Sequence, residues 1–520
     1  MAPVSKEAPF YGALGIIMET NFHASIRPMP NPPTLWLNLF QREDQAVPLR
    51  ERLCAALRGA IRRGELGQGA RLPSTRMLAA DLAISRVTAE AAYAQLESEG
   101  YLTRRVGHGT VVSIAAPAAP APAPARGELA QARLSRRGAA IVATGGCVDP
   151  REPRAFCAGS PDLRAFPVET WRQITARQLR RHGAQLMGYG DPQGYAPLRA
   201  AVAAYLAQSR GVRCDSDQVV ILTSSQQALQ LLATLLLDPG DSVHLEEPGY
   251  LGARNAFASA GARIVPLPVD AEGATLPAGA ARLTYLTPSH QYPLGVTLSL
   301  ARRLALLDAA EQQGGWIVED DYDSEFRYDA RPLPAMQGLD RHGRVIYLGT
   351  FSKVLFPSLR LAYAVLPPAL VEPLVRTRTV MDGHSAQLAQ AVTAEFIAHG
   401  HFARHLRQMR LLYASRRALL LERLRVEGIS WLTPLAGSGG LQLAATLPPG
   451  SEATLTRQAA ALGIATPSLS SLHMLGEGEG WLLGYAALRN EEIVDAVAHL
   501  ATLRPGRGRQ GGGPSPRHRA

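Results

Sequence analysis

The chain has 520 residues, of which 46% are hydrophobic and 19% charged, so it is long enough for two or three folded domains and too apolar for a disordered protein. Its four cysteines lack metal-ligand spacing and no apolar run is long enough to span a bilayer, which argues against a zinc or other metal site and a membrane protein, and favours the cytoplasm. The net charge of +10 is concentrated in two segments, because residues 46–114 carry ten arginines against six acidic residues and residues 504–520 carry five arginines and no acidic residue.

Composition and pattern divide the chain into five segments. Residues 1–33 are predicted to be irregular, residues 34–114 to form a small basic domain, and residues 504–520 a disordered, basic tail rich in glycine and proline. Residues 115–150 contain the run "AAPAAPAPAPARGE", which favours extended conformations and predicts a semi-rigid linker. Residues 151–503 are close to neutral and are predicted to form a larger domain.

The basic domain is predicted to contain three helices followed by a hairpin. Apolar residues recur at helical spacing in "LRERLCAALRGAI", and Ser74 and Ser85 are suitable N-caps for two further helices. Two short strands follow, residues 101–103 and 110–113, joined by "RRVGHG". This order predicts a winged helix-turn-helix, mainly α with a β wing, whose third helix enters the major groove of double-stranded DNA.

The candidate DNA contacts lie at the starts of the second and third helices and on the wing. A solvated basic surface is the simpler alternative, but the stretch "LPSTRMLAADLAISRVTAEAAYAQLESEGYLTRRVGHGT" resembles the GntR-type DNA-binding domain along its whole length. The resemblance implies binding to a promoter region. The predicted DNA-binding residues are Arg76, Ser85, Arg86, Thr88, Arg104, Arg105, Gly107 and Gly109.

The larger domain alternates strand and helix patterns, which predicts an α/β fold with a mainly parallel sheet. "QVVILTSSQQALQLLATLLL" is typical of a strand, a polar turn and a helix, and such a turn suits a phosphate. "GGWIVEDDYDSEFRY" is an apolar strand that ends at Asp320 and Asp321, and "RVIYLGTFSK" is another that leads to Lys353. Each signal alone is weak, since serine caps and surface aspartates are common.

Together, the three strand ends have the order that a pyridoxal phosphate (PLP) site requires. A lysine forms a Schiff base with the cofactor aldehyde, and an aspartate keeps the ring nitrogen protonated. Residues 155–500 resemble class I aminotransferases, which implies a fold-type I domain with PLP bound to Lys353 as an internal aldimine. By this resemblance, the other cofactor-binding residues are Ser225, Gln226, Tyr250, Asp320, Tyr322, Thr350, Ser352 and Arg360, with Tyr189 reaching the phosphate of the partner subunit in a homodimer.

A GntR-type domain joined to such a domain resembles the MocR/GabR subfamily of transcription regulators, especially in "TPSHQYPLG" and "EDDYDSEFRYD". The resemblance implies a PLP-dependent regulator that senses PLP itself, an amine or an amino acid. Two alternatives are a working aminotransferase with an accessory DNA-binding domain and a cofactor-free dimerisation scaffold. Leu482 stands where aminotransferases usually have a carboxylate-binding arginine, and Tyr292 stands where they have an asparagine. Unless Arg489 or Arg254 substitutes for that arginine, these changes argue against ordinary transamination.

Overall fold

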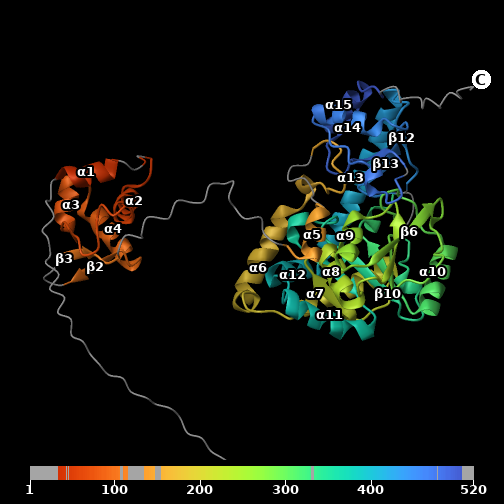
Figure 1. The fold of residues 1–520 in the computed structure, drawn as a ribbon, viewed down its shortest axis with the longest axis horizontal. Helices are drawn as coiled ribbons and strands as arrows, with labels where there is room; N and C mark the ends of the chain where they lie inside the picture. The colour runs from red at the N-terminus through yellow and green to blue at the C-terminus, as the bar shows by residue number, and fades with distance from the viewer. Residues whose placement is uncertain are drawn as a thin grey trace, which may run out of the picture. The chain divides into compact units, whose positions relative to one another are not determined.

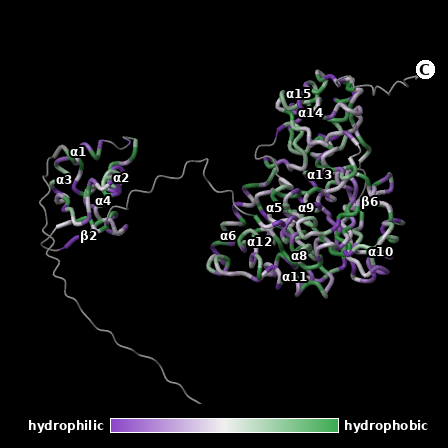
Figure 2. Tube along the Cα trace, viewed as in Figure 1, coloured by the Kyte–Doolittle hydropathy of each residue, from purple (hydrophilic) through white to green (hydrophobic). Residues whose placement is uncertain are grey.

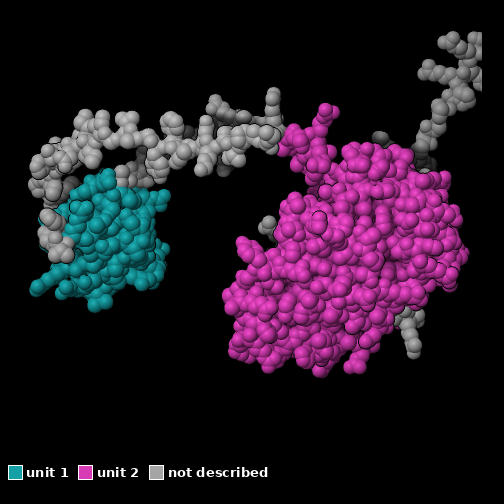
Figure 3. Space-filling model, turned by 90° about the horizontal axis from the view of Figure 1, so that it is seen from below, with its two compact units in different colours: residues 1–132 teal, residues 133–520 magenta. Residues whose placement is uncertain are grey.

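The computed structural model of the chain describes residues 33–41, 44, 46–105, 109–114, 134–146, 154–328, 333–437, 439–476 and 478–505. Figure 3 shows two compact units, residues 1–132 and residues 133–520. The predicted basic tail after residue 505, most of the predicted irregular N-terminal segment and residues 115–133 of the predicted linker lie outside the described ranges.

The smaller unit is a winged helix-turn-helix (Figure 1). Ser74 and Ser85 cap helices as predicted, because their Oγ atoms accept hydrogen bonds from the backbone N–H of Met77 at 3.2 Å and of Thr88 at 3.0 Å. The wing is an antiparallel sheet in the order β1-β3-β2. Its elements are α1 (Pro33–Gln41), α2 (Leu49–Arg62), β1 (Arg71–Leu72), α3 (Thr75–Asp81), α4 (Arg86–Ser98), β2 (Leu102–Arg105) and β3 (Gly109–Val112).

Helix α1 and strand β1 are additions to the three helices and two strands that the sequence pattern predicted. Trp36, Leu39 and Phe40 follow helical spacing and are buried in the same core as the other helices. The prediction missed α1 because this apolar pattern spans only two turns. Strand β1 is two residues long and forms only by pairing with β3, so its local sequence carries no strand signal.

The larger unit is built on an eight-stranded sheet in the order β4-β11-β10-β9-β8-β5-β6-β7. Apart from β11 and β7, which pair antiparallel with their neighbours, all its strands run in the same direction. The strands are β4 (Val219–Leu222), β5 (Ser242–Glu247), β6 (Arg263–Asp270), β7 (Gly273–Ala274), β8 (Leu283–Leu286), β9 (Trp316–Asp321), β10 (Val345–Thr350) and β11 (Ala362–Val365).

Helices cover both faces of this sheet because its strands are apolar on both sides. In β10, Ile346 and Leu348 pack in the same cluster as residues of α8, α9 and α11, while Tyr347 packs with residues of α7, α12 and α13. Hydrophobic and hydrophilic residues alternate along these helices (Figure 2). The helices are α6 (Val168–Leu186), α7 (Ala196–Arg210), α8 (Ser225–Leu236), α9 (Leu251–Ser259), α10 (Leu300–Gln313), α11 (Pro368–Met381), α12 (Gln387–Ala398) and α13 (His401–Val426).

The C-terminal part of this unit forms a second, antiparallel sheet in the order β12-β13-β14. Its strands are β12 (Thr433–Pro434), β13 (Gln442–Thr446) and β14 (Gly480–Gly484), and its helices are α14 (Glu452–Ala461) and α15 (Asn490–Ala501). These elements and those of the eight-stranded sheet confirm the predicted fold class. No helix within the described ranges is long and apolar enough to cross a membrane.

One further helix, α5 (Arg136–Ala143), lies in the segment that was predicted to be linker. The segment 115–150 is therefore not extended throughout. Ser135 caps this helix by accepting a hydrogen bond from the Gly138 N–H at 3.0 Å. The Ala-Pro run dominated the prediction for the whole segment, although "LSRRGAAIVA" has an N-cap and helix-forming residues.

Candidate cofactor site and DNA-binding surface

A cleft of about 760 Å³ opens where several strands of the large sheet end. Strands β9 and β10 are parallel neighbours with Leu348 opposite Asp320, so the residues that come after them emerge at the same edge of the sheet. Every residue predicted to bind the cofactor lines this cleft except Tyr189. Those that line it are Ser225, Gln226, Tyr250, Asp320, Tyr322, Thr350, Ser352, Lys353 and Arg360.

Lys353 lies in the turn that comes after β10, and Gly159 leaves room for its amino group. Thr350 Oγ1 accepts a hydrogen bond from the Ser352 N–H at 3.1 Å, which holds the start of this turn. A Cβ atom on Gly159 would lie 3.0 Å from Lys353 Nζ, and Gly159 has a φ of +73°. Glycine is therefore favoured here for both its backbone and the space it leaves.

The two carboxylate oxygens of Asp320 differ in their hydrogen bonding. Tyr285 Oη donates a hydrogen bond to Asp320 Oδ2 at 2.7 Å, whereas Oδ1 is buried and has no partner among the residues that the structure describes. Burial raises the pKa of Asp320 to about 7, against the lowering effect of the Tyr285 hydrogen bond. A protonated ring nitrogen is the kind of donor that would satisfy Oδ1 and stabilise the carboxylate.

The part of the cleft lined by the start of α8 is suited to an anion. Helix α8 begins there, and Ser224 caps it by accepting a hydrogen bond from the Gln227 N–H at 3.1 Å. Ser224 lines the cleft together with Ser225 and Gln226, so the polar turn begins one residue before the predicted pair. Free N–H groups at a helix N-terminus attract phosphate, and the guanidinium of Arg360 lines the same cleft.

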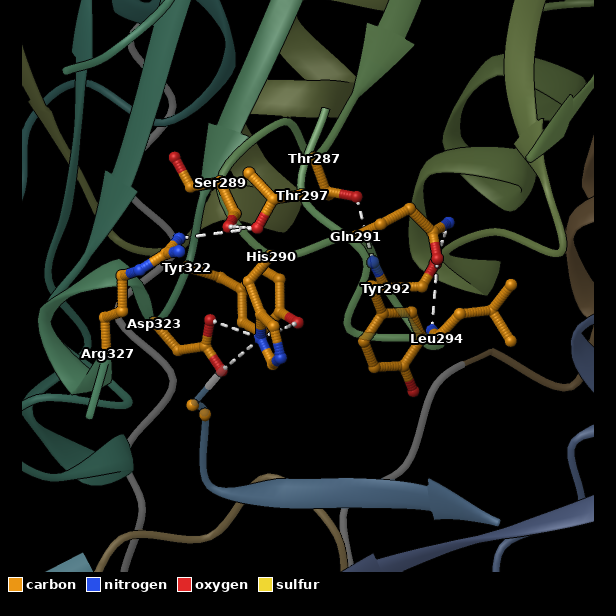
Figure 4. A network of polar contacts seen from close by, with 12 residues as sticks. Thr287, Ser289, His290, Gln291, Tyr292, Leu294, Thr297, Tyr322, Asp323 and Arg327 are labelled. Carbon is orange, nitrogen blue, oxygen red and sulfur yellow. Dashed lines mark hydrogen bonds and ion pairs between the residues drawn. The ribbon is translucent and has the colours of Figure 1, made fainter. Parts of the chain in front are cut away.

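Tyr322 is positioned by a buried histidine–aspartate pair (Figure 4). His290 Nδ1 lies 3.0 Å from Asp323 Oδ1 and 3.1 Å from Tyr322 Oη. Burial lowers the pKa of His290, but the Asp323 carboxylate outweighs it, so that the pKa is raised overall. With Nδ1 protonated, His290 donates its single Nδ1–H to the Asp323 carboxylate, and the 3.1 Å contact holds the Tyr322 hydroxyl beside this pair.

Tyr292, in the place of the expected asparagine, forms part of the wall of the cleft. Its ring packs edge-to-face against Tyr250 at 5.7 Å and against Tyr322 at 5.9 Å between centroids. Its backbone N–H donates to Thr287 Oγ1 at 2.9 Å, and Gln291 Oε1 accepts from the Leu294 N–H at 3.0 Å (Figure 4). The loop thus replaces a polar amide with an aromatic wall.

Tyr189 does not reach the cleft of its own chain. Its side chain is 99% exposed, and its ring lies 6.1 Å from that of His384. Its predicted role would require a second subunit, so it stays a prediction.

Several lining residues were not among those the sequence predicted. Gln442 comes from β13, Tyr285 from β8, and Ile141 and Thr144 from α5 and its C-terminus. Their local sequences carry no signal of a binding site, because each is an ordinary residue of a strand or short helix.

The predicted DNA-binding side chains lie on the surface of the smaller unit. Arg76 and Arg86 are in the first turns of α3 and α4, and Arg104 and Arg105 are on β2. All of those that the structure describes are exposed except Thr88, which is half-buried; the exposed residues are Arg76, Ser85, Arg86, Arg104, Arg105 and Gly109. Arg86 Nε lies 3.9 Å from Glu90 Oε2, an exposed pair that leaves the arginine available. Gly107 lies outside the described ranges.

Comparison with known proteins supports both units. The family models "Bacterial regulatory proteins, gntR family" and "Aminotransferase class I and II" match residues 49–112 and 155–500. The "Probable rhizopine catabolism regulatory protein MocR" of Rhizobium meliloti is 42% identical over 467 residues, 88% of this chain and 94% of its own. The "Uncharacterized HTH-type transcriptional regulator YhdI" of Bacillus subtilis is 35% identical over 469 residues, 89% of this chain and 97% of its own.

Among solved structures, the α-aminoadipate aminotransferase LysN of Thermus thermophilus is 35% identical with a TM-score of 0.62, over 67% of this chain and 90% of its own. The larger unit therefore belongs to the class I and II aminotransferase family, whose fold-type I domains generally bind PLP. The whole chain belongs to the MocR subfamily of GntR-type transcription regulators. This membership favours a regulator over an aminotransferase with an accessory DNA-binding domain.

Proposed function

We propose that this transcription regulator binds PLP covalently through Lys353 and couples the state of that site to DNA binding. The observation that carries the proposal is the pairing of Lys353 with the unpartnered Asp320 Oδ1 in one described cleft. Tyr250 supplies a face for ring stacking, and the α8 N-terminus and Arg360 suit the phosphate. In support, the LysN structure is complexed with N-(5'-phosphopyridoxyl)-L-leucine.

The chemistry explains why such a site can act as a sensor. When bound, PLP supplies an aldehyde that reacts reversibly with primary amines. An effector that changes the group bonded to Lys353 makes different contacts in the two states of the cleft, which is the condition for shifting a conformational equilibrium. The effector is PLP itself, an amine or an amino acid.

The first test of the proposal concerns DNA. We predict that Arg86→Ala weakens binding to DNA from upstream of the regulated gene by at least about tenfold, because a bidentate arginine contact is worth about 1–3 kcal/mol. Fluorescence anisotropy at several salt concentrations measures the effect. Since Arg86 is exposed, the melting temperature should not change.

Arg50→Ala is the matched control, because Arg50 is an exposed arginine on α2 outside the predicted contact set. It removes the same charge and should weaken binding far less. Equal losses in the two variants would mean that net charge alone attracts DNA, and would contradict the assignment of Arg86. Footprints of the PLP-loaded and PLP-free proteins then test the coupling.

We also propose that the larger unit forms a homodimer through the surface around Tyr189. Met187, Tyr189 and Val380 are 78%, 99% and 88% exposed. The two segments that carry them lie side by side, because the Gly190 N–H donates to His384 Nε2 at 3.1 Å. Large apolar side chains exposed on two neighbouring segments favour a protein partner, and a second copy would bring Tyr189 to the neighbouring cleft.

We predict that Met187→Asp combined with Val380→Asp converts the dimer to a monomer at micromolar concentration, since two buried charges at an apolar interface cost several kcal/mol. Sedimentation velocity measures the mass. Leu300→Asp is the control, because Leu300 is also exposed, at 61%, but begins α10. A dimer that survives the double substitution would place the interface elsewhere.

A further inference from the structure

The cationic groups in the cleft are few. Among its lining residues within the described ranges, Lys353 and Arg360 are the only lysine or arginine. The proposed function assigns Lys353 to the cofactor aldehyde and Arg360 to the phosphate, so neither remains for a carboxylate on the effector. A carboxylate taken into a partly buried cleft without a cation loses hydration and gains no ion pair, which opposes binding.

The wall where an aminotransferase would place its substrate-binding arginine is apolar. Leu482 lies on β14 opposite Ala444 of β13 and is 1% exposed. It forms a buried cluster with Ala444, Leu469 and Leu472. The residues that pack against this cluster include Leu251 and Tyr292, which line the cleft. The side of the cleft next to Leu482 thus favours an apolar group of a ligand over a charged one.

One uncharged polar group stands beside the lysine. Gln442, on β13, is 6% exposed and lines the cleft. Its Oε1 is buried and has no hydrogen-bond partner within the described part of the chain. The position of a Cβ on Gly159 lies 3.7 Å from Gln442 Oε1 and 3.0 Å from Lys353 Nζ, so both atoms border the same small space. A buried amide oxygen without a donor is costly, and a bound ligand would satisfy it.

From these features we propose that the effector is a primary amine that has no carboxylate on its amino-bearing carbon and carries an uncharged donor, such as a hydroxyl, within reach of Gln442. This inference rests on the proposed function, because the amino group is the part that reacts with PLP. Of the effector classes given above (PLP itself, an amine or an amino acid), it retains only amines whose other groups carry no charge. Leu482 and Gln442 are its specificity-determining residues.

The test uses pairs of compounds that differ only by the carboxylate, added to the full-length, PLP-loaded protein. The pairs are 2-aminoethanol with L-serine and 3-aminopropan-1-ol with L-homoserine, and ethylamine serves as the amine without a hydroxyl. We expect each amino alcohol to shift the cofactor absorbance and the melting temperature at a concentration at least about tenfold lower than its amino acid. We expect 2-aminoethanol to act at a lower concentration than ethylamine.

Substitutions at two positions test which residue favours the hydroxyl and which disfavours the carboxylate. Gln442→Leu should remove the advantage of 2-aminoethanol over ethylamine while PLP still binds. Leu482→Arg should raise the affinity for L-serine and narrow or reverse the preference, whereas Leu482→Met, of similar volume and without charge, should leave it unchanged. If Leu482→Arg does not fold, the comparison of wild type with Gln442→Leu still decides the question.

The outcomes distinguish a failure of this inference about the effector from a failure of the proposed function on which it rests. A protein that binds PLP but responds to the amino acids as well as to the amino alcohols, or to neither, overturns the inference alone. A protein that never acquires the cofactor absorbance overturns the proposed function and the inference with it.

Discussion

Lys353→Ala abolishes the visible absorbance band that the wild-type protein acquires with PLP after the excess cofactor is removed. This is the largest effect we expect, because no other lysine lines the described part of the cleft and the methyl group of alanine cannot bond to an aldehyde. Absorbance spectra of the two proteins, recorded side by side after gel filtration, measure the result.

DNA binding by the Lys353→Ala variant should remain within about threefold of wild type in the absence of effector, because the substitution lies in the larger unit and the DNA contacts in the smaller one. Arg425→Ala is a control, since it removes a cationic side chain of the larger unit that is 73% exposed and does not line the cleft. A band that persists in Lys353→Ala would mean that another nucleophile holds the cofactor. A loss of DNA binding without misfolding would contradict independent function of the two units.

Asp320→Asn should weaken cofactor binding and stabilise the cofactor-free protein. Asparagine keeps an acceptor for Tyr285 but presents no negative charge to a ring nitrogen, so the affinity for PLP should fall about 10–100-fold, as expected for the loss of one charge-assisted hydrogen bond. Equilibrium dialysis with PLP measures this loss. The cofactor-free protein should instead become more stable, because the substitution removes a buried carboxylate that is costly to ionise.

The pH dependence is set by the direction of the pKa shift. Burial raises the folded-state pKa of Asp320 from 3.8 to about 7, so the wild-type protein has an ionisation penalty that grows as pH rises between these values and is absent below them. The penalty is on the order of a few kcal/mol. The asparagine side chain does not titrate, so the variant should melt a few degrees above wild type at pH 8 and close to it at pH 4.

Glu319→Gln provides the control for this experiment. Glu319 is also buried with a pKa raised to about 7, but it accepts hydrogen bonds from the backbone N–H of Met336 and Gln337 and does not line the cleft. The substitution should alter the pH dependence of melting without changing the affinity for PLP. An Asp320→Asn protein that melts below wild type at every pH, or that binds PLP equally well, would contradict the role assigned to Asp320.

Several features of both units were determined by the local sequence. Ser74 and Ser85 cap helices because an N-cap is satisfied within three residues of chain. Asp320 and Lys353 were recognisable because each lies at or just after the end of an apolar strand, and parallel strands bring their C-terminal ends to one edge of a sheet. The order of those motifs along the chain was sufficient to predict the fold class and the strand ends that bring Asp320 and Lys353 to the cleft.

Only the tertiary structure decided which other residues meet at that edge. Tyr285 holds Asp320 across two neighbouring strands, and Gln442 comes close to Lys353 from a different sheet. Such contacts depend on strand order and on the packing of the C-terminal sheet, which local sequence does not encode. The same holds for the raised pKa of Asp320, because burial is a property of everything packed around a group. Residue types and their spacing therefore predicted the chemistry that we propose for the cleft, and the packing around it is the basis of the selectivity that we propose.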